Sequence, residues 1–345
     1  VASSRGLGDV YKRQEEIANY IVSDGKGILA ADESSGTIEK RFKSINVEST
    51  EDNRRKYREM LFRSPVMAEA IGGVILFDET LRQKSSDGDY LRNVILDHGS
   101  LPGIKVDQGV KEFEGGSDEK ITTGLDGLHE RCQEYEKLGA KFTKWRAVIN
   151  VSDEIPSNNC ISENMNALAE YALIAQQNNM VPIVEPEVIM DGSHSVERCH
   201  EVTNQTLLVL FEMLDKKNVN IKGTLLKPNM VVSGTENNYQ APIEEVAEKT
   251  LQCLKSSVPD ELPGIVFLSG GQSDLDATAH LDAMNKIGGF KWKLSFSYGR
   301  ALQQAALKTW AGKDDNLEAA QKAFSHRAVM NMKAAQGQWD KSLEG

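Results

Sequence analysis

The sequence predicts an α/β fold of the TIM-barrel type, a single (β/α)₈ barrel. A short apolar, β-branched segment followed by a polar loop and a longer amphipathic segment recurs eight times along the 345 residues. Alternation of this kind implies parallel strands joined by right-handed crossovers, and eight units are the number that closes a barrel. No linker-like or low-complexity stretch divides the chain.

The strands and helices can be placed in order from the same pattern. The strands are expected at 27–33, 72–78, 103–109, 142–149, 180–188, 223–230, 264–271 and 293–299. The helices are expected at 50–63, 124–138, 161–178, 195–217, 242–257, 274–287 and 299–311, with Ser or Asp as caps at several starts, and a further helix follows the first strand. The barrel is predicted to occupy residues 15–345, and residues 1–14 are predicted to lie outside it.

An open doubly wound sheet is the alternative architecture. It would require a glycine-rich turn after the first strand, where a dinucleotide phosphate binds. The first strand instead runs into ADESSGT, which has an acidic residue at that place. The barrel is therefore the preferred interpretation.

Composition excludes several classes of function. The formal net charge of −11 argues against nucleic-acid binding, and no apolar run approaches the roughly 20 residues that a bilayer requires. The four cysteines, which are far apart, indicate a reducing compartment such as the cytoplasm. Residues 1–14 lack the apolar core of a secretory signal, and a plastid transit segment upstream is left open.

Charged residues gather near the carboxyl ends of the predicted strands, where barrel enzymes place their chemistry. They are Asp32, Asp78, Lys105, Asp107, Lys144, Arg146, Glu185, Glu187 and Lys227. In three strands two of these residues are separated by two positions, so each pair shares one face of its strand. The pattern predicts one polar mouth, and interior ion pairs that only stabilise the barrel are the alternative.

Lys227 has the surroundings of a nucleophilic lysine. It follows the apolar run TLL and precedes Pro228, which keeps the segment extended. Burial and neighbouring cations would lower its pKa and favour the neutral amine that attacks a carbonyl. A strand-end lysine that binds phosphate or carboxylate is the alternative, and only the other charges of the mouth favour the nucleophile.

Two loops are predicted to bind phosphate, because the loops after strands seven and eight commonly do so in this fold. The residues are Ser269, Gly270 and Gly271 in LSGGQS and Ser297, Gly299 and Arg300 in SYGRA. Lys40 and Arg41 could serve a second phosphate, or they could form a solvated helix face. The six histidines show no metal-binding spacing, and the cluster His194, Cys199 and His200 has no fourth ligand, so neither a metal nor another cofactor is expected.

The same residues carry a resemblance to class I fructose-bisphosphate aldolases from about Glu15 to Gln338. The segments GILAADES, GIKVDQG, KWRAVI, VPIVEPE, TLLKPNM, FLSGGQS and FSYGRAL are similar to that family's motifs in order and spacing. The resemblance implies reversible cleavage of fructose 1,6-bisphosphate to dihydroxyacetone phosphate and glyceraldehyde 3-phosphate, in glycolysis and gluconeogenesis, through a lysine Schiff base without a metal. It also implies a cytoplasmic homotetramer that binds small sugar phosphates.

The resemblance further implies a role for each matching residue. Lys227 would form the imine, Glu185 would be the general acid and base, Glu187 would shape the imine, Asp32 would act in carbon–carbon cleavage, and Lys144 would hold the reacting oxygens. Lys105 and Arg146 would face the phosphate end of the substrate. Ser269, Gly270, Gly299 and Arg300 would bind the 1-phosphate, and Ser34, Thr37, Lys40 and Arg41 would handle the 6-phosphate.

Two alternatives and one departure accompany the resemblance. Another Schiff-base barrel lyase, similar to transaldolase, is the second enzyme hypothesis, and a scaffold that binds actin or acidic protein tails is the hypothesis from another class. Family members usually end in a tail whose last residue is tyrosine, whereas no tyrosine follows Tyr298 here. We therefore expect imine formation to survive while turnover is reduced.

Overall fold

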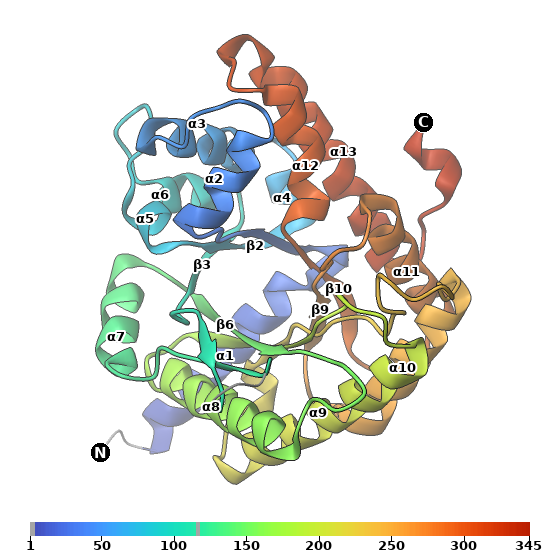
Figure 1. Cartoon of the computed structure of the whole chain (residues 1–345). Coiled ribbons are helices and arrows are strands. Elements are labelled where there is room, and N and C mark those ends of the chain that lie inside the picture. The colour runs from blue at the N-terminus through green and yellow to red at the C-terminus, as the bar shows by residue number, and fades with distance from the viewer. Residues whose placement is uncertain (1–3, 115–117) are drawn as a thin grey trace.

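Eight parallel strands close into one barrel in the computed structural model, which describes residues 4–114 and 118–345 (Figure 1). The strands are β1 (Gly27–Ala31), β2 (Ile71–Leu76), β3 (Leu101–Lys105), β6 (Phe142–Ile149), β7 (Val181–Val188), β8 (Leu225–Leu226), β9 (Gly264–Phe267) and β10 (Lys293–Tyr298). Their order around the barrel is the order of the sequence, and β1 pairs with both β2 and β10. The predicted (β/α)₈ architecture is confirmed.

The helices surround the strands, and most lie where the pattern predicts them. They are α2 (Ser35–Lys43), α3 (Glu51–Phe62), α7 (Leu128–Leu138), α8 (Asn158–Gln177), α9 (Val196–Lys216), α10 (Ile243–Ser257), α11 (Asp274–Ile287) and α12 (Arg300–Trp310). The side-chain oxygens of Thr50, Ser157, Ser195 and Ser273 each accept a backbone N–H in the first turn of the helix that follows. Polar caps therefore fix four of these helix starts, since the first turn of a helix lacks internal acceptors.

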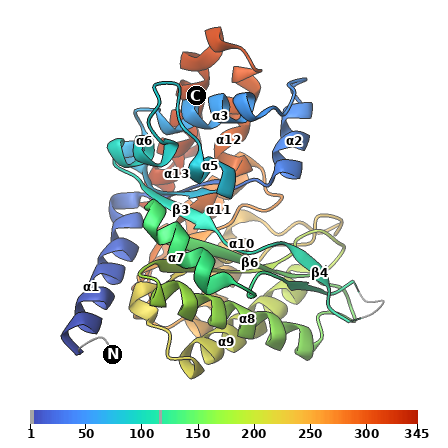
Figure 2. The ribbon, with the colours of Figure 1, turned by 90° about the vertical axis from the view of Figure 1, so that its left-hand side faces the viewer.

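The core has two parts, one inside the barrel and one between the strands and their helices. Inside the barrel, the half nearer the amino ends of the strands is filled by apolar side chains that include Ile28, Phe142, Ile183, Leu225 and Val266. Helix α1 (Ser4–Ile21) packs against the amino end of the barrel, on the side of the molecule away from β4 (Val110–Glu112) (Figure 2). The amino end of the barrel is thus apolar and closed, which leaves the carboxyl end for polar groups.

Several boundaries differ from those predicted. The first and third strands end at Ala31 and Lys105, and only Leu225 and Leu226 of 223–230 belong to the barrel ladder. Asp78 lies at the start of α5 (Asp78–Arg82) and not in a strand, and its carboxylate pairs with Arg82 outside the mouth at 3.1 Å. The chain turns into loops and helices as soon as each strand reaches the rim, so the final polar residues leave the ladder.

Some elements were not predicted. An antiparallel hairpin of β4 (Val110–Glu112) and β5 (Lys120–Thr122) follows β3, and so the helix expected from residue 124 begins at Leu128. The others are the helices α1 (Ser4–Ile21), α4 (Met67–Ala70), α5 (Asp78–Arg82), α6 (Leu91–Asp97) and α13 (Leu317–Ala335) and the 3₁₀ turns η1 (Ser23–Gly25), η2 (Ile221–Gly223), η3 (Asp314–Asn316) and η4 (Lys341–Glu344).

Helix α1 begins inside the segment 1–14. Its Gln14 is buried and donates through Nε2 to the Gln176 carbonyl at 2.8 Å. Side chains from Gly8 to Arg13 are mostly exposed. The limit of the barrel domain at residue 15 stays a prediction.

Candidate active site

A cleft of about 370 Å³ opens at the carboxyl end of the barrel. Most of the residues that the sequence singled out line it: Asp32, Ser34, Thr37, Arg41, Lys105, Lys144, Arg146, Glu185, Glu187, Lys227, Ser269, Gly270, Ser297, Gly299 and Arg300. They come from the ends of seven strands and from α2 and α12. The predicted polar mouth is therefore present as one continuous surface.

Four charged groups form a chain across the floor of this cleft. Lys144 Nζ lies 2.8 Å from Asp32 Oδ2 and 3.4 Å from Glu185 Oε2. The other Glu185 oxygen, Oε1, lies 3.7 Å from Lys227 Nζ. Lys144, Glu185 and Lys227 come from three neighbouring strands, whereas Asp32 reaches across from the end of β1. The backbone N–H of Lys227 donates to the Val184 carbonyl at 2.9 Å, which holds this lysine beside β7.

The surroundings set different protonation states along the chain. Burial alone would raise the Asp32 pKa, but the Lys144 and Lys227 cations outweigh it and lower this pKa to about 2. Burial opposes the Lys144 cation, yet Asp32 and Glu185 prevail and raise the pKa of Lys144. Burial is the largest influence on Lys227 and lowers its pKa, and Lys144 lowers it further while Glu185 opposes both. Lys227 is therefore the lysine of the two that loses its proton more readily.

A second layer of charges lies nearer the rim. Lys105 Nζ pairs with Asp107 Oδ1 at 3.2 Å, and Arg146 Nε contacts Glu187 Oε2. The second oxygen of Asp107 accepts the Arg146 backbone N–H at 3.2 Å. The residues two apart on β6 and β7 thus form two levels, because Lys144 meets Glu185 at the floor while Arg146 meets Glu187 above it.

The two loops predicted to bind phosphate lie side by side at one edge of the cleft, because they follow the neighbouring strands β9 and β10. Gly270 has a φ of +56°, which a side chain would disfavour, and Arg300 Nη2 donates to its carbonyl at 3.2 Å. The hydroxyl of Ser297 points from β10 and has no hydrogen-bond partner among the described residues. Backbone N–H groups at the start of α12 complete an anion-binding geometry.

Two of the predicted phosphate ligands do not line this cleft. Gly271 turns away, and its N–H donates to Met190 Sδ at 2.9 Å. Lys40 lines a neighbouring cavity of about 230 Å³, whose wall also includes Arg41, Arg300 and Lys308. One helical residue rotates the side-chain direction by about 100°, and Arg41 therefore reaches the cleft as well as this cavity, whereas Lys40 reaches the cavity alone.

Three residues that hold Arg41 in place were not predicted from the sequence. Glu33 Oε1 accepts from Arg41 Nη1 at 2.7 Å and from Gln303 Nε2 at 2.9 Å, and Glu33 Oε2 lies 3.5 Å from Arg58 Nη2. Glu33 follows Asp32 in AADES and could have been noticed there. Arg58 and Gln303 lie on α3 and α12 among many polar residues, and no local pattern marks them as buried.

Within the part of the chain that the structure describes, no three His, Cys, Asp or Glu side chains are grouped as a metal site would require. His194 and Cys199 are both buried, and the four cysteines are free thiols. A search of the described helices found none that is long and apolar enough to span a bilayer.

Comparison with known proteins places the chain in one family. The family model of class-I fructose-bisphosphate aldolase matches residues 14–345. A probable fructose-bisphosphate aldolase class 1 of Xanthomonas axonopodis pv. citri is 55% identical over 94% of this chain and 97% of its own length. The cytosolic fructose-bisphosphate aldolase 4 of Arabidopsis thaliana is 50% identical over 95% of this chain and 84% of its own.

A solved structure agrees with these relatives. The fructose-bisphosphate aldolase of Plasmodium falciparum, crystallised with TRAP and a small-molecule inhibitor, superposes with a TM-score of 0.95 at 45% identity, and 96% of each chain is covered. The barrel, the charged floor and the extent of these matches agree with one another. The chain belongs to the class-I fructose-bisphosphate aldolase family.

Proposed function

We propose that this chain cleaves fructose 1,6-bisphosphate reversibly to dihydroxyacetone phosphate and glyceraldehyde 3-phosphate, with Lys227 as the imine-forming residue. The observation that carries the proposal is the buried chain Lys227–Glu185–Lys144–Asp32. It combines an amine of lowered pKa with two carboxylates on one side of a cleft that has cations at its rim. A bisphosphate is favoured because the two adjacent loops that meet at Gly270 and Arg300 offer one anion site, while Ser34 and Thr37 offer polar groups for another.

The reaction follows from where the protons can go. The Lys227 ammonium first gives a proton to the Glu185 carboxylate beside it, and the resulting neutral amine adds to the substrate ketone. A second proton passes from the nitrogen to the former ketone oxygen, which becomes the carbinolamine hydroxyl. Glu185 then gives its proton to this hydroxyl, which leaves as water and produces a protonated imine. Asp32 then accepts the proton of the hydroxyl beside the bond to be broken. As that hydroxyl oxygen becomes an aldehyde, the carbon–carbon bond breaks and its electron pair moves into the imine, which gives an enamine. Protonation of the enamine carbon and hydrolysis release the second product and the free lysine.

The protonation states of the floor suit these roles. Asp32, with its pKa of about 2, is ionised at neutral pH and can act as a base. Lys144 stays cationic, because it lies between Asp32 and Glu185, and can stabilise the developing alkoxide. Arg146 holds Glu187 by a direct ion pair at the rim, where Glu187 can shape the imine pocket.

No metal or other cofactor is part of the proposal. The protonated imine is itself the electron sink for the cleaved bond, a task that a free ketone performs poorly. We further propose a cytoplasmic location, as for the cytosolic Arabidopsis relatives, and assembly as a homotetramer. Binding of actin or of acidic protein tails is a secondary proposal, supported by the basic rim and by the complex of the Plasmodium aldolase with TRAP.

Reductive trapping tests the proposal directly. The protein is incubated with dihydroxyacetone phosphate and borohydride in excess EDTA, and the modified peptide is mapped by mass spectrometry. A single adduct on Lys227 is expected, while Lys227→Met gives none and Lys105→Met, a lysine of the same cleft, still gives it. Adduct on another lysine, or trapping that EDTA abolishes, contradicts the mechanism.

A further inference from the structure

We infer that Arg58 is a positioning residue for substrate phosphate, which acts by neutralising Glu33 and so leaves the charge of Arg41 available to the cleft. Arg58 is 1% exposed and lies behind the cleft, where it cannot touch substrate. Its Nη2 donates to the Glu33 carbonyl at 3.0 Å and lies 3.5 Å from Glu33 Oε2, and its Nη1 donates to Thr80 at 2.8 Å. The inference rests on the proposed function, because it concerns the same bisphosphate cleft.

The charge of the surrounding cluster explains why a hidden arginine matters. Glu33 pairs with Arg41 at 2.7 Å, and on its own this pair would be neutral. Glu79 lies within 4.0 Å of Arg58 but makes its short contact with Arg54, at 2.8 Å. The cluster therefore holds three arginines and two carboxylates, namely Arg41, Arg54 and Arg58 with Glu33 and Glu79, and has a net charge of one positive unit. Of these arginines, Arg41 lines the cleft. Without Arg58 the cluster would be neutral, and Glu33 would compete with substrate for Arg41.

Geometry supports the same role. Gln303 Nε2 bridges Glu33 Oε1 and the Ala30 carbonyl, at 2.9 and 2.8 Å, and Tyr57 donates to the Gln303 amide oxygen. The Glu33 carboxylate is therefore held by partners on α2, α3 and α12. The second amino group of Arg41, Nη2, lies 3.7 Å from the place where a side chain of Gly299 would begin, so it faces the loop before α12. Fixing Glu33 fixes the direction of that group.

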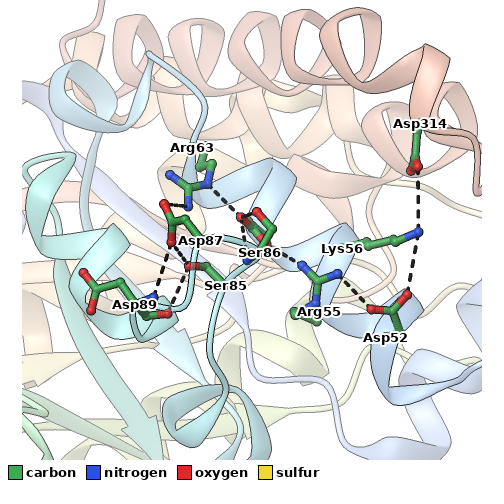
Figure 3. Close-up of polar contacts among 10 residues, drawn as sticks. Asp52, Arg55, Lys56, Arg63, Ser85, Ser86, Asp87, Asp89 and Asp314 are labelled. Carbon is green, nitrogen blue, oxygen red and sulfur yellow. Dashed lines mark hydrogen bonds and ion pairs between the residues drawn. The ribbon is translucent and has the colours of Figure 1, made fainter.

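Ion pairs and hydrogen bonds on the outer side of α3 hold this helix in the position that places Arg58 beside Glu33. On its outer side Arg63 pairs with Asp87, in the loop that also contains Ser86, at 2.9 Å, and Lys56 lies 3.7 Å from Asp314 of η3, while Arg55 pairs with Asp52 of the same helix (Figure 3). Glu59 accepts the Ser86 hydroxyl at 2.7 Å and pairs with Arg55 at 2.6 Å. Arg55 lies on the same helix and is equally engaged in ion pairs, but it does not contact Glu33. It is therefore the matched control for Arg58.

The test compares Arg58→Met, Arg58→Met/Glu33→Gln and Arg55→Met. For Arg58→Met, KM for fructose 1,6-bisphosphate and Kd for inorganic phosphate by calorimetry are both expected to rise about tenfold, the factor for one lost charge-assisted hydrogen bond, with kcat nearly unchanged. The double variant restores the single positive charge of the cluster and should recover most of the affinity. Arg55→Met should change stability without changing KM.

Each outcome decides the point. Unchanged KM and Kd in Arg58→Met, an equal loss in Arg55→Met, or no recovery in the double variant overturns the inference. If Arg58→Met does not fold by circular dichroism, Arg58→Lys carries the test, because it keeps the charge. Affinity near that of the wild type then supports charge compensation, and a tenfold loss refutes it. If the wild-type protein binds phosphate but does not cleave fructose 1,6-bisphosphate, the proposed function is contradicted. The role of Arg58 is then tested by the phosphate dissociation constants of the variants alone.

Discussion

Replacement of Lys144 by methionine should move the titration of Lys227 to higher pH. The two ammonium nitrogens contact the two oxygens of Glu185, at 3.4 and 3.7 Å. If they lie roughly 7 Å apart, an effective dielectric constant of about 20 gives about 2 kcal/mol of repulsion, between one and two pKa units. This repulsion is one cause of the lowered pKa of Lys227. In Lys144→Met it disappears, and Glu185 and Asp32 lose a competing cation.

The assay is the initial rate of borohydride-trapped imine on Lys227 with dihydroxyacetone phosphate, followed from mildly acidic to strongly alkaline pH. The midpoint of the rise should lie between about one and two pH units higher in Lys144→Met than in the wild type. Lys141→Met, which removes a lysine just before the amino end of β6, is the control and should keep the wild-type midpoint. A midpoint that stays in place or falls in Lys144→Met would refute the electrostatic coupling.

Three further predictions concern stability and phosphate affinity. The Asp32 pKa of about 2 lies below its ordinary value of 3.8, so its ionisation stabilises the fold fully above pH 3.8 and this stabilisation is lost as pH falls through 2. The unfolding free energy of Asp32→Asn should therefore fall by about 2 kcal/mol less than that of the wild type when the pH is lowered through this range. Thermal unfolding midpoints that fall equally in the variant and in the wild type on acidification would contradict this. Gly72→Ala should lower the unfolding free energy by about 3 kcal/mol, because its new Cβ would lie 2.1 Å from the Ile21 carbonyl oxygen. Gly36 has open space around it, so Gly36→Ala should not destabilise the protein. Equal melting temperatures of the two variants would disprove the clash. Ser297→Ala should raise KM about tenfold without loss of stability. The control Ser295→Ala loses a 2.7 Å hydrogen bond to the Lys26 carbonyl, so its unfolding free energy should fall by about 1 kcal/mol with KM unchanged. The reverse pattern would contradict the assignment of Ser297 to the phosphate site.

The parts of the site on strands could be predicted from the sequence, and the parts on helices mostly could not. The two-residue period of a strand puts Lys144 and Arg146 on one face of β6 and Glu185 and Glu187 on one face of β7, so each pair could be assigned to the mouth from the sequence. On α2 Arg41 lines both the cleft and the neighbouring cavity, whereas the adjacent Lys40 lines only that cavity, and only the packing of the helix decides which of the two reaches the cleft.

Contacts between distant segments set the remaining limit. Gln303 and Glu33 are 270 positions apart, and their hydrogen bond exists because β1 and β10 are neighbours in the closed barrel. Knowing the strand order would bring these segments together, but it would not show that an arginine of α3 lies between them. The hairpin of β4 and β5 escaped prediction because its first strand is fully exposed and lacks the apolar alternation of a packed strand.

The distribution of charge along the barrel explains why the fold tolerates four ionised groups at the floor of the mouth. At the amino end the interior is apolar, with Ile28, Phe142 and Leu225 in contact. Toward the carboxyl end each buried charge meets an opposite charge, since Lys144 lies between two carboxylates and Glu185 between two lysines. Removing one partner leaves an uncompensated buried ion, which lowers the unfolding free energy by about 3–5 kcal/mol. Replacing any single member of the set is therefore destabilising. The residue at which the compensation is weakest is Lys227, because burial and Lys144 together outweigh Glu185, and it is therefore the group most easily converted to the neutral amine that the reaction requires.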